Sequence, residues 1–207
     1  MDVTHTFVSA VSDGVDDTLV QPTDWNADHT LSPGKLTIRP AIVAGKIAAQ
    51  SKPTAVTVGA HTGYSLPVYN SDNEELFFRS YVPGRWDGAS DITCSVICVL
   101  AGAEDVGDKF QLQVSWENKA VDSGVISTST TDVPVETTIL TDRAAQYSIY
   151  QVDFTIDWNA GTPDIVASDH VAFRLRRIAA SELEVAAEII ILDILLTYDV
   201  DKIFKTA

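Results

Sequence analysis

Alternation of apolar and polar residues recurs through the second half of the chain and predicts β-strands. The clearest case is residues 110–117, where apolar and polar side chains alternate without a break, as expected of a strand with one buried face. No segment predicts a long helix. The pattern indicates about eight strands, spaced roughly ten to fifteen residues apart, at 64–69, 76–82, 92–100, 110–117, 133–140, 147–158, 171–176 and 187–200.

The number and spacing of these strands predict an all-β fold. We expect an antiparallel two-sheet sandwich that is jelly-roll-like, preceded by an extended N-terminal arm. An immunoglobulin-like sandwich stays open, because a strand count alone does not separate the two folds. The Cys…Trp…Cys arrangement of true immunoglobulin domains is absent from the sequence. Pro134 predicts that its strand lies at a sheet edge or begins there.

Residues 1–34 differ from the rest of the chain and predict the arm. Short apolar pieces are broken there by Asp-Gly, Gln-Pro and Ser-Pro-Gly, which are turn signals without a regular period. Several large apolar side chains would be costly to leave in water, so we expect the arm to dock on its own domain or on a neighbouring protein. A loosely ordered tail is the alternative. The expected docking residues are Phe7, Leu19, Val20 and Trp25.

The two remaining regions are a linker and the sandwich. Residues 35–63 are expected to form a linker that could hold a short strand or a helical turn. Residues 64–207 are expected to form the sandwich, which ends in the strand 187–200. The even positions of that strand, from Ile190 to Val200, are apolar and should face the core.

The odd positions of the same strand suggest a second partner surface. Ile189, Ile191 and Leu195 are apolar as well, and the sequence names no partner for them within one subunit. We therefore predict a homotrimer in which these three residues lie at or near the trimer axis. Asp193 interrupts the apolar run, which is too short for a membrane span of about 20 residues, so membrane insertion is not expected.

Composition and charge narrow the class of partner. The chain has 207 residues, of which 45% are apolar and 21% charged, and a net charge of −15. Such an acidic chain would be repelled by a phosphate backbone, so nucleic acid is not an expected partner. Cys94 and Cys98 should be small buried thiols, because strand geometry holds them about 13 Å apart. The N-terminus lacks the features of a signal peptide, so we expect synthesis in a cytoplasm without export.

Signatures of catalysis and of metal binding are absent from the sequence. It contains no nucleophile elbow, P-loop, dinucleotide fingerprint or HExxH motif. Two acidic residues could flank a sugar as in a glycosidase, but a solvated acidic surface explains them more simply. The four histidines do not converge in sequence as metal ligands would. We expect no enzyme activity, no catalytic residue, no cofactor and no metal.

Two aromatic residues near one loop are candidates for binding a ligand. Trp86 lies in the segment VPGRWDG, and Tyr81 precedes it. An exposed aromatic ring there could stack on a sugar or anchor an interface. The alternative for Trp86 is that it folds back and caps the end of the sandwich. The basic cluster Arg174, Arg176 and Arg177 is expected to pair with carboxylates rather than with phosphate.

Three stretches resemble structural proteins of tailed bacteriophages. Residues 5–29, HTFVSAVSDGVDDTLVQPTDWNADH, resemble the N-terminal segment HTFVSxxxDGxDxTLVxPxDWNxxH of tail-associated and other structural proteins. Residues 77–116 resemble a β-rich virion domain with a P-x-x-W-D-G turn. Residues 162–178 resemble the GD-x-V-x-F-R-V-x-R strand of that domain, although Ser168-Asp169-His170 stands where Gly-Asp is usual.

The resemblance implies a non-enzymatic virion structural protein. It would be a trimeric capsid decoration or tail-associated protein, made in the host cytoplasm and attached through its arm to the major capsid or tail protein. A receptor- or carbohydrate-binding module of a tail fibre, which contacts a host-surface glycan through Tyr81 and Trp86 or residues 122–132, is the alternative. A glycan-degrading enzyme is a third reading.

Overall fold

The computed structural model describes residues 2–3, 29–30, 34–45, 52–69, 74–120, 126, 129–161 and 164–200. These residues form two compact units, of which the larger comprises Lys35–Asp199. In the smaller unit, β1 (Asp2–Val3) pairs with β2 (His29–Thr30). The four predicted docking residues of the arm, Phe7, Leu19, Val20 and Trp25, lie outside the described residues.

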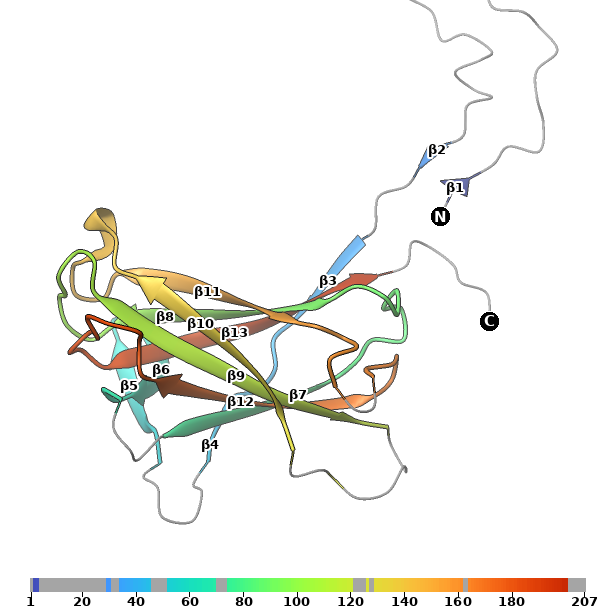
Figure 1. Cartoon of the computed structure of the whole chain (residues 1–207), viewed down its shortest axis with the longest axis horizontal. Coiled ribbons are helices and arrows are strands. Elements are labelled where there is room, and N and C mark those ends of the chain that lie inside the picture. The colour runs from blue at the N-terminus through green and yellow to red at the C-terminus, as the bar shows by residue number, and fades with distance from the viewer. Residues whose placement is uncertain are drawn as a thin grey trace, which may run out of the picture. The chain divides into compact units, whose positions relative to one another are not determined.

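The larger unit is built of strands in two antiparallel sheets (Figure 1). The long strands are β6 (His61–Leu66), β7 (Glu75–Tyr81), β8 (Ile92–Leu100), β9 (Lys109–Lys119), β10 (Thr131–Thr138), β11 (Ile149–Ile156), β12 (His170–Ile178) and β13 (Ile189–Val200). Shorter strands are β3 (Gly34–Ile38), β4 (Val43–Ala44) and β5 (Thr54–Val58). The 3-10 helix η1 (Thr141–Arg143) precedes β11. Within the described ranges, no helix is long and apolar enough to span a membrane.

The order of the strands is that of a jelly roll. One sheet has the order β10-β9-β12-β7-β4, and the other β11-β8-β13-β6-β5. Among β6 to β13, every connection except the one from β9 to β10 passes from one sheet to the other, as two interlocked Greek keys require. The prediction of an all-β, antiparallel two-sheet sandwich is therefore confirmed.

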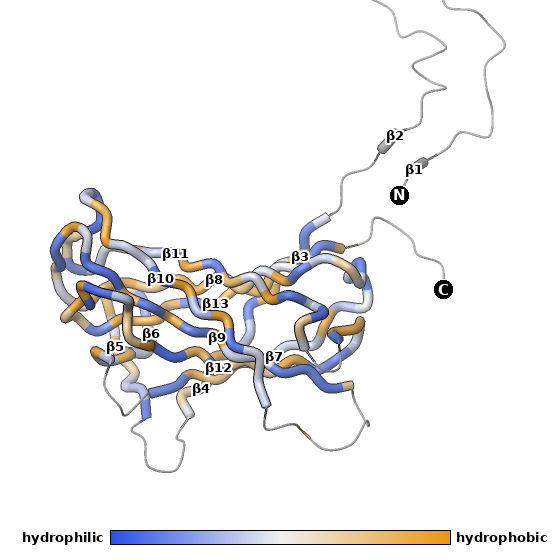
Figure 2. Tube along the Cα trace, in the orientation of Figure 1, coloured by the Kyte–Doolittle hydropathy of each residue, from blue (hydrophilic) through white to orange (hydrophobic). Residues whose placement is uncertain are grey.

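Alternating side chains fill the space between the sheets, and Figure 2 shows the alternation of hydropathy along the strands. On β11 every second residue is buried, from Tyr150 to Ile156. On β9 the alternate apolar residues from Phe110 to Trp116 are buried, and the intervening Gln113 and Ser115 are buried as well. Phe110 of one sheet meets Tyr150 of the other at 5.6 Å between ring centroids. Cys94 and Cys98 are buried free thiols, as predicted, and burial raises the pKa of Cys98 to about 12.

The region expected to be a linker contributes to both sheets. β3 and β6 pair with β13, β5 pairs with β6, and β4 pairs with β7. The sandwich therefore begins at Lys35 rather than at residue 64. The described part of residues 35–63 contains short strands and no helical turn. Pro134 does lie on an edge strand, β10, as its missing N–H predicts.

A β-bulge in β13 corrects the predicted faces of that strand. Opposite β8, Ile191 pairs with Cys98 and Asp193 with Ile97, so Leu192 is an extra residue. Because of this extra residue, odd-numbered side chains face the core before the bulge and even-numbered ones after it. Ile189 and Ile191 therefore share the core face with Ile194, and all three are fully buried. Figure 1 shows β13 running through the middle of its sheet.

The bulge removes the premise of the predicted trimer surface. Ile189 and Ile191, expected to lack a partner within one subunit, are buried in the core of a single chain. Leu195 alone of the three lies on the opposite face, where it is half-buried beside Ser95. The homotrimer itself stays a prediction, without Ile189 and Ile191 as its contacts.

Candidate functional site

A groove of about 580 Å³ crosses the outer face of the five-stranded sheet at β4, β7 and β12. We call it the β7–β12 groove; it is lined by Ala41, Val43, Phe77, Phe78, Arg79, His170, Ala172 and Phe173. Its volume lies within the range of about 300–1,000 Å³ that small-ligand sites occupy. The sheet therefore presents a hollow large enough for a small ligand.

The hollow follows from the residues that alternation places on this face. On β12 the outward positions are His170, Ala172 and Arg174, since Val171 and Phe173 are buried. Ala172 is the smallest of the three, and it lies directly opposite Arg79 of β7. A methyl group between two long side chains leaves room above the sheet at that point.

An aromatic pair lies at one end of the groove. Tyr81 and His170 are cross-strand partners, and their rings meet edge to face at 5.4 Å and 74°. An edge-to-face contact covers at most one face of the Tyr81 ring, and this residue remains 62% exposed. The structure therefore places Tyr81, one of the two aromatic residues singled out from the sequence, beside the groove.

The other end of the groove is polar and tightly packed. Arg174, the cross-strand partner of Phe77, has its Nε 3.6 Å from Oε1 of Glu75 and donates from Nη2 to Oγ of Ser115 at 3.3 Å. Glu75 is only 3% exposed, and its Oε2 has no hydrogen-bond partner among the described residues. Burial raises the pKa of Glu75, although the nearby charges of Arg174 and Arg176 lower it.

A neighbouring ion pair joins β12 to the edge strand β10. Nη2 of Arg176 lies 3.9 Å from Oδ2 of Asp132. The pKa of Asp132 is lowered: partial burial opposes the shift, but hydrogen bonding to Ser115 and the charge of Arg176 outweigh it. The prediction that the basic cluster pairs with carboxylates is therefore confirmed for Arg174 and Arg176.

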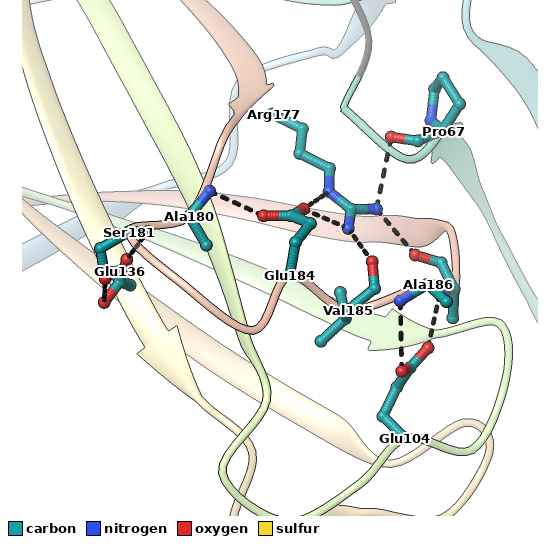
Figure 3. A network of polar contacts seen from close by, with 10 residues as sticks. Pro67, Glu104, Glu136, Arg177, Ala180, Ser181, Glu184, Val185 and Ala186 are labelled. Carbon is teal, nitrogen blue, oxygen red and sulfur yellow. Dashed lines mark hydrogen bonds and ion pairs between the residues drawn. The ribbon is translucent and has the colours of Figure 1, made fainter.

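Arg177, the third member of that cluster, has a structural role on the inner side of the sheet (Figure 3). It is 3% exposed, and its Nε donates to Oε1 of Glu184 at 2.9 Å. Its two other nitrogens donate to the carbonyl oxygens of Pro67, Val185 and Ala187. Arg177 thus ties the connection between β12 and β13 to the end of β6, and it is not available to a ligand.

Trp86 does not belong to the exposed surface, which corrects its assignment to a ligand loop. It is 3% exposed, packs edge to face against Trp158 at 6.3 Å, and donates from Nε1 to the carbonyl oxygen of Ser90 at 3.1 Å. The alternative interpretation, in which Trp86 caps the end of the sandwich, is the one that the structure bears out. Of residues 122–132, only part is described.

The sequence singled out Tyr81 but missed other residues of the groove, among them Phe77 and Arg79. These two residues and Tyr81 occupy consecutive outward positions of β7. Two aromatic residues on a face that faces solvent are a signal, and the alternation of β7 would have revealed it. The contribution of Val43 had no such signal, because β4 is two residues long and reaches β7 only through pairing in the folded sheet.

Comparison with known proteins gives distant likenesses. No family model matches the sequence, and no curated protein matches it. The chain is similar to a family 11 carbohydrate-binding module from Clostridium thermocellum in complex with a β-1,3-1,4-mixed-linked tetrasaccharide (9% identity, TM-score 0.37, covering 84% of this chain and 92% of that one). It is also similar to a xylan-binding module (11% identity, TM-score 0.34, covering 81% of this chain and 97% of that one).

A third likeness is to the K3 cleaved adhesin domain of Lys-gingipain from Porphyromonas gingivalis (12% identity, TM-score 0.31, covering 66% of this chain and 72% of that one). TM-scores between 0.31 and 0.37 are too low to support a conclusion about function.

No group of three or more His, Cys, Asp or Glu side chains that could hold a metal ion occurs among the residues that the structure describes.

Proposed function

We propose that the chain is a non-catalytic carbohydrate-binding module that takes a saccharide in the β7–β12 groove. The observation that carries the proposal is the position of Tyr81, which is 62% exposed at the end of a hollow of about 580 Å³. Sugars present apolar C–H faces that pack on aromatic rings, and hydroxyl groups that pair with planar polar side chains. Tyr81 provides the first kind of contact, and Arg79 and His170 provide the second.

The distribution of carboxylates supports binding rather than hydrolysis. Glycosidases use two carboxyl groups that flank the scissile bond, and none of the residues that line the groove is acidic. Glu117 lies across from Ala172 on the β9 side, and Glu75 is engaged by Arg174. The groove is therefore suited to hold a glycan without cleaving it.

Tyr81→Ala tests the proposal directly. Wild-type protein should bind one or more glycans on an array. Isothermal titration with such a glycan should then show that the variant binds with an affinity lower by a factor on the order of ten or more. The reason is that an aromatic contact contributes about 1 kcal/mol beyond its buried area. Ala172→Leu, which fills the hollow, should abolish binding while the circular dichroism spectrum stays unchanged.

The matched control is Tyr147→Ala. Tyr147 is 47% exposed and lies on the connection that leads to β11 in the other sheet, so its loss should leave glycan affinity unchanged. Absence of binding to every glycan on the array, or an equal loss in both tyrosine variants, would refute the proposed function.

A second candidate is the virion structural protein, and the observation that favours it is the resemblance of residues 5–29 to the phage N-terminal segment. The two proposals are compatible, since a glycan-binding domain can be carried on a particle by an arm. Three copies on one particle would raise the effective concentration of weak binding sites. Locating the chain in an electron-microscopy map of an intact particle would test this candidate.

A further inference from the structure

The β7–β12 groove lies in a basic environment within a strongly acidic protein. The chain carries a net charge of −15. In two neighbouring cross-strand rows at the groove, the cations Arg79 and Lys119 lie with a single carboxylate, Glu117. A local excess of positive charge that opposes the overall charge indicates an anionic ligand.

Arg79 is the arginine that lines the groove. Arg174 and Arg176 are held near Glu75 and Asp132. Arg79 is exposed, lines the groove, and makes no ion pair with any residue that the structure describes. Its cross-strand neighbour Ala172 ends at a methyl group, so a ligand can approach the guanidinium from above the sheet.

The shape of the guanidinium favours a carboxylate. Arginine presents parallel N–H donors in a planar fork, which matches the two oxygens of a carboxylate. The exposed face of Tyr81 lies one position further along the same face of β7, about 7 Å away at the spacing of alternate strand residues. This separation lets one sugar ring pack on Tyr81 while the carboxylate of an adjacent unit reaches Arg79.

We propose that the groove selects saccharides that contain uronic-acid units, with Arg79 holding the carboxylate. This inference rests on the proposed carbohydrate-binding function and adds the chemical class of the ligand. A neutral saccharide would leave the Arg79 guanidinium without a charged partner, so the free acid should bind more tightly than its neutral ester.

The test compares each uronate with its own methyl ester. Tetrasaccharides of galacturonate, of mannuronate and of a glucuronate-containing chain are titrated as free acids and as esters. For one or more of the three, wild-type protein should bind the acid at least about tenfold more tightly, as expected for a charge-assisted hydrogen-bonded pair. Arg79→Gln should remove this preference, and Arg79→Lys, which keeps the charge without the fork, should retain only part of it.

Arg143→Gln is the control, because it removes the same charge from η1, outside the groove; the preference for the acid should persist. Equal affinities for acid and ester, binding restricted to neutral glycans, or binding to sulfated but not carboxylated chains would overturn the uronate inference while the proposed function stands. Failure to bind any saccharide would overturn both.

Discussion

Glu75 shows how a single residue on the sheet face links stability to the site. Its carboxylate is 3% exposed on the outer side of β7, next in line after Phe77 of the groove. Burial raises its pKa, and Arg174 and Arg176 only partly offset this. Ionised Glu75 therefore costs the folded state free energy relative to the protonated form.

Glu75→Gln should gain stability relative to wild type as the pH rises. Below the unfolded pKa of about 4.3 the side chain is neutral in both states, and above the raised folded pKa wild type carries the cost of a buried charge. The difference in free energy of unfolding, variant minus wild type, should therefore increase as the pH rises from about 4 through the raised folded pKa. Urea denaturation at several pH values measures it, and a flat difference would contradict the prediction.

For Asp132→Asn, the difference in free energy of unfolding, variant minus wild type, should change with pH in the opposite direction. The pKa of Asp132 is lowered because hydrogen bonding to Ser115 and the charge of Arg176 outweigh the opposing effect of burial. Its ionised form therefore stabilises the fold above the unfolded pKa of about 3.9, and this contribution is lost as the pH falls through the folded pKa. The variant should lose stability relative to wild type as the pH rises from the lowered folded pKa through the unfolded pKa of about 3.9.

At the scale of the element, β13 combines a central position with a bulge. Leu192 is one residue too many for the ladder with β8, since Ile191 and Asp193 face the consecutive residues Cys98 and Ile97. The carbonyl oxygen of Ile191 approaches Gly63 of β6 so closely that a Cβ there would lie 2.4 Å from it. The bulge is thus accommodated by a glycine on the neighbouring strand.

Deletion of Leu192 should be tolerated better than deletion of Leu195. Without Leu192 the ladder becomes regular, and the buried residues Ile191 and Ile194 keep their faces. Without Leu195, either Leu196 turns outward or Asp193 turns into the core, because one step of register reverses every side chain. Burial of an unpaired carboxylate costs several kcal/mol.

Thermal unfolding of the two deletion variants measures the difference. The protein without Leu192 should give a cooperative transition and a near-ultraviolet spectrum like that of wild type. The protein without Leu195 should be unfolded or aggregated. Equal stability of the two would mean that the bulge can move along β13.

At the scale of the whole molecule, the unit Lys35–Asp199 contains both sheets and the groove. The arm is proposed to attach the protein to a particle, whereas the groove is proposed to bind glycan. Removal of residues 1–33, which ends before β3, should leave a folded protein with unchanged glycan affinity that no longer joins particles.

Co-sedimentation with particles lacking the wild-type protein measures attachment, and isothermal titration measures glycan affinity. Full-length protein is the control in both assays. Full occupancy of particles by the truncated protein would refute the role of the arm, and loss of folding would show that residues 1–33 belong to the sandwich. Light scattering of the same samples tests the predicted trimer, which a monomer at micromolar concentration would contradict.

The amino-acid sequence determined the long strands and the class of fold. The period of two in β8, β9, β11 and β12 follows from local geometry, since alternate side chains of any strand point to opposite faces. It was therefore visible without neighbours, as was the edge position of Pro134. The pairing of the basic cluster followed from the excess of acidic residues.

Only the tertiary structure decided which faces were buried and where a ligand could lie. Which side chains of β13 face the core depends on one extra residue opposite β8, and no sequence pattern within β13 reveals this residue. Trp86 and Tyr81 looked alike in sequence, yet Trp158 covers one and solvent reaches the other. The groove likewise joins β4, β7 and β12, which are distant in the chain. Such contacts arise from long-range packing, which a one-dimensional pattern does not contain.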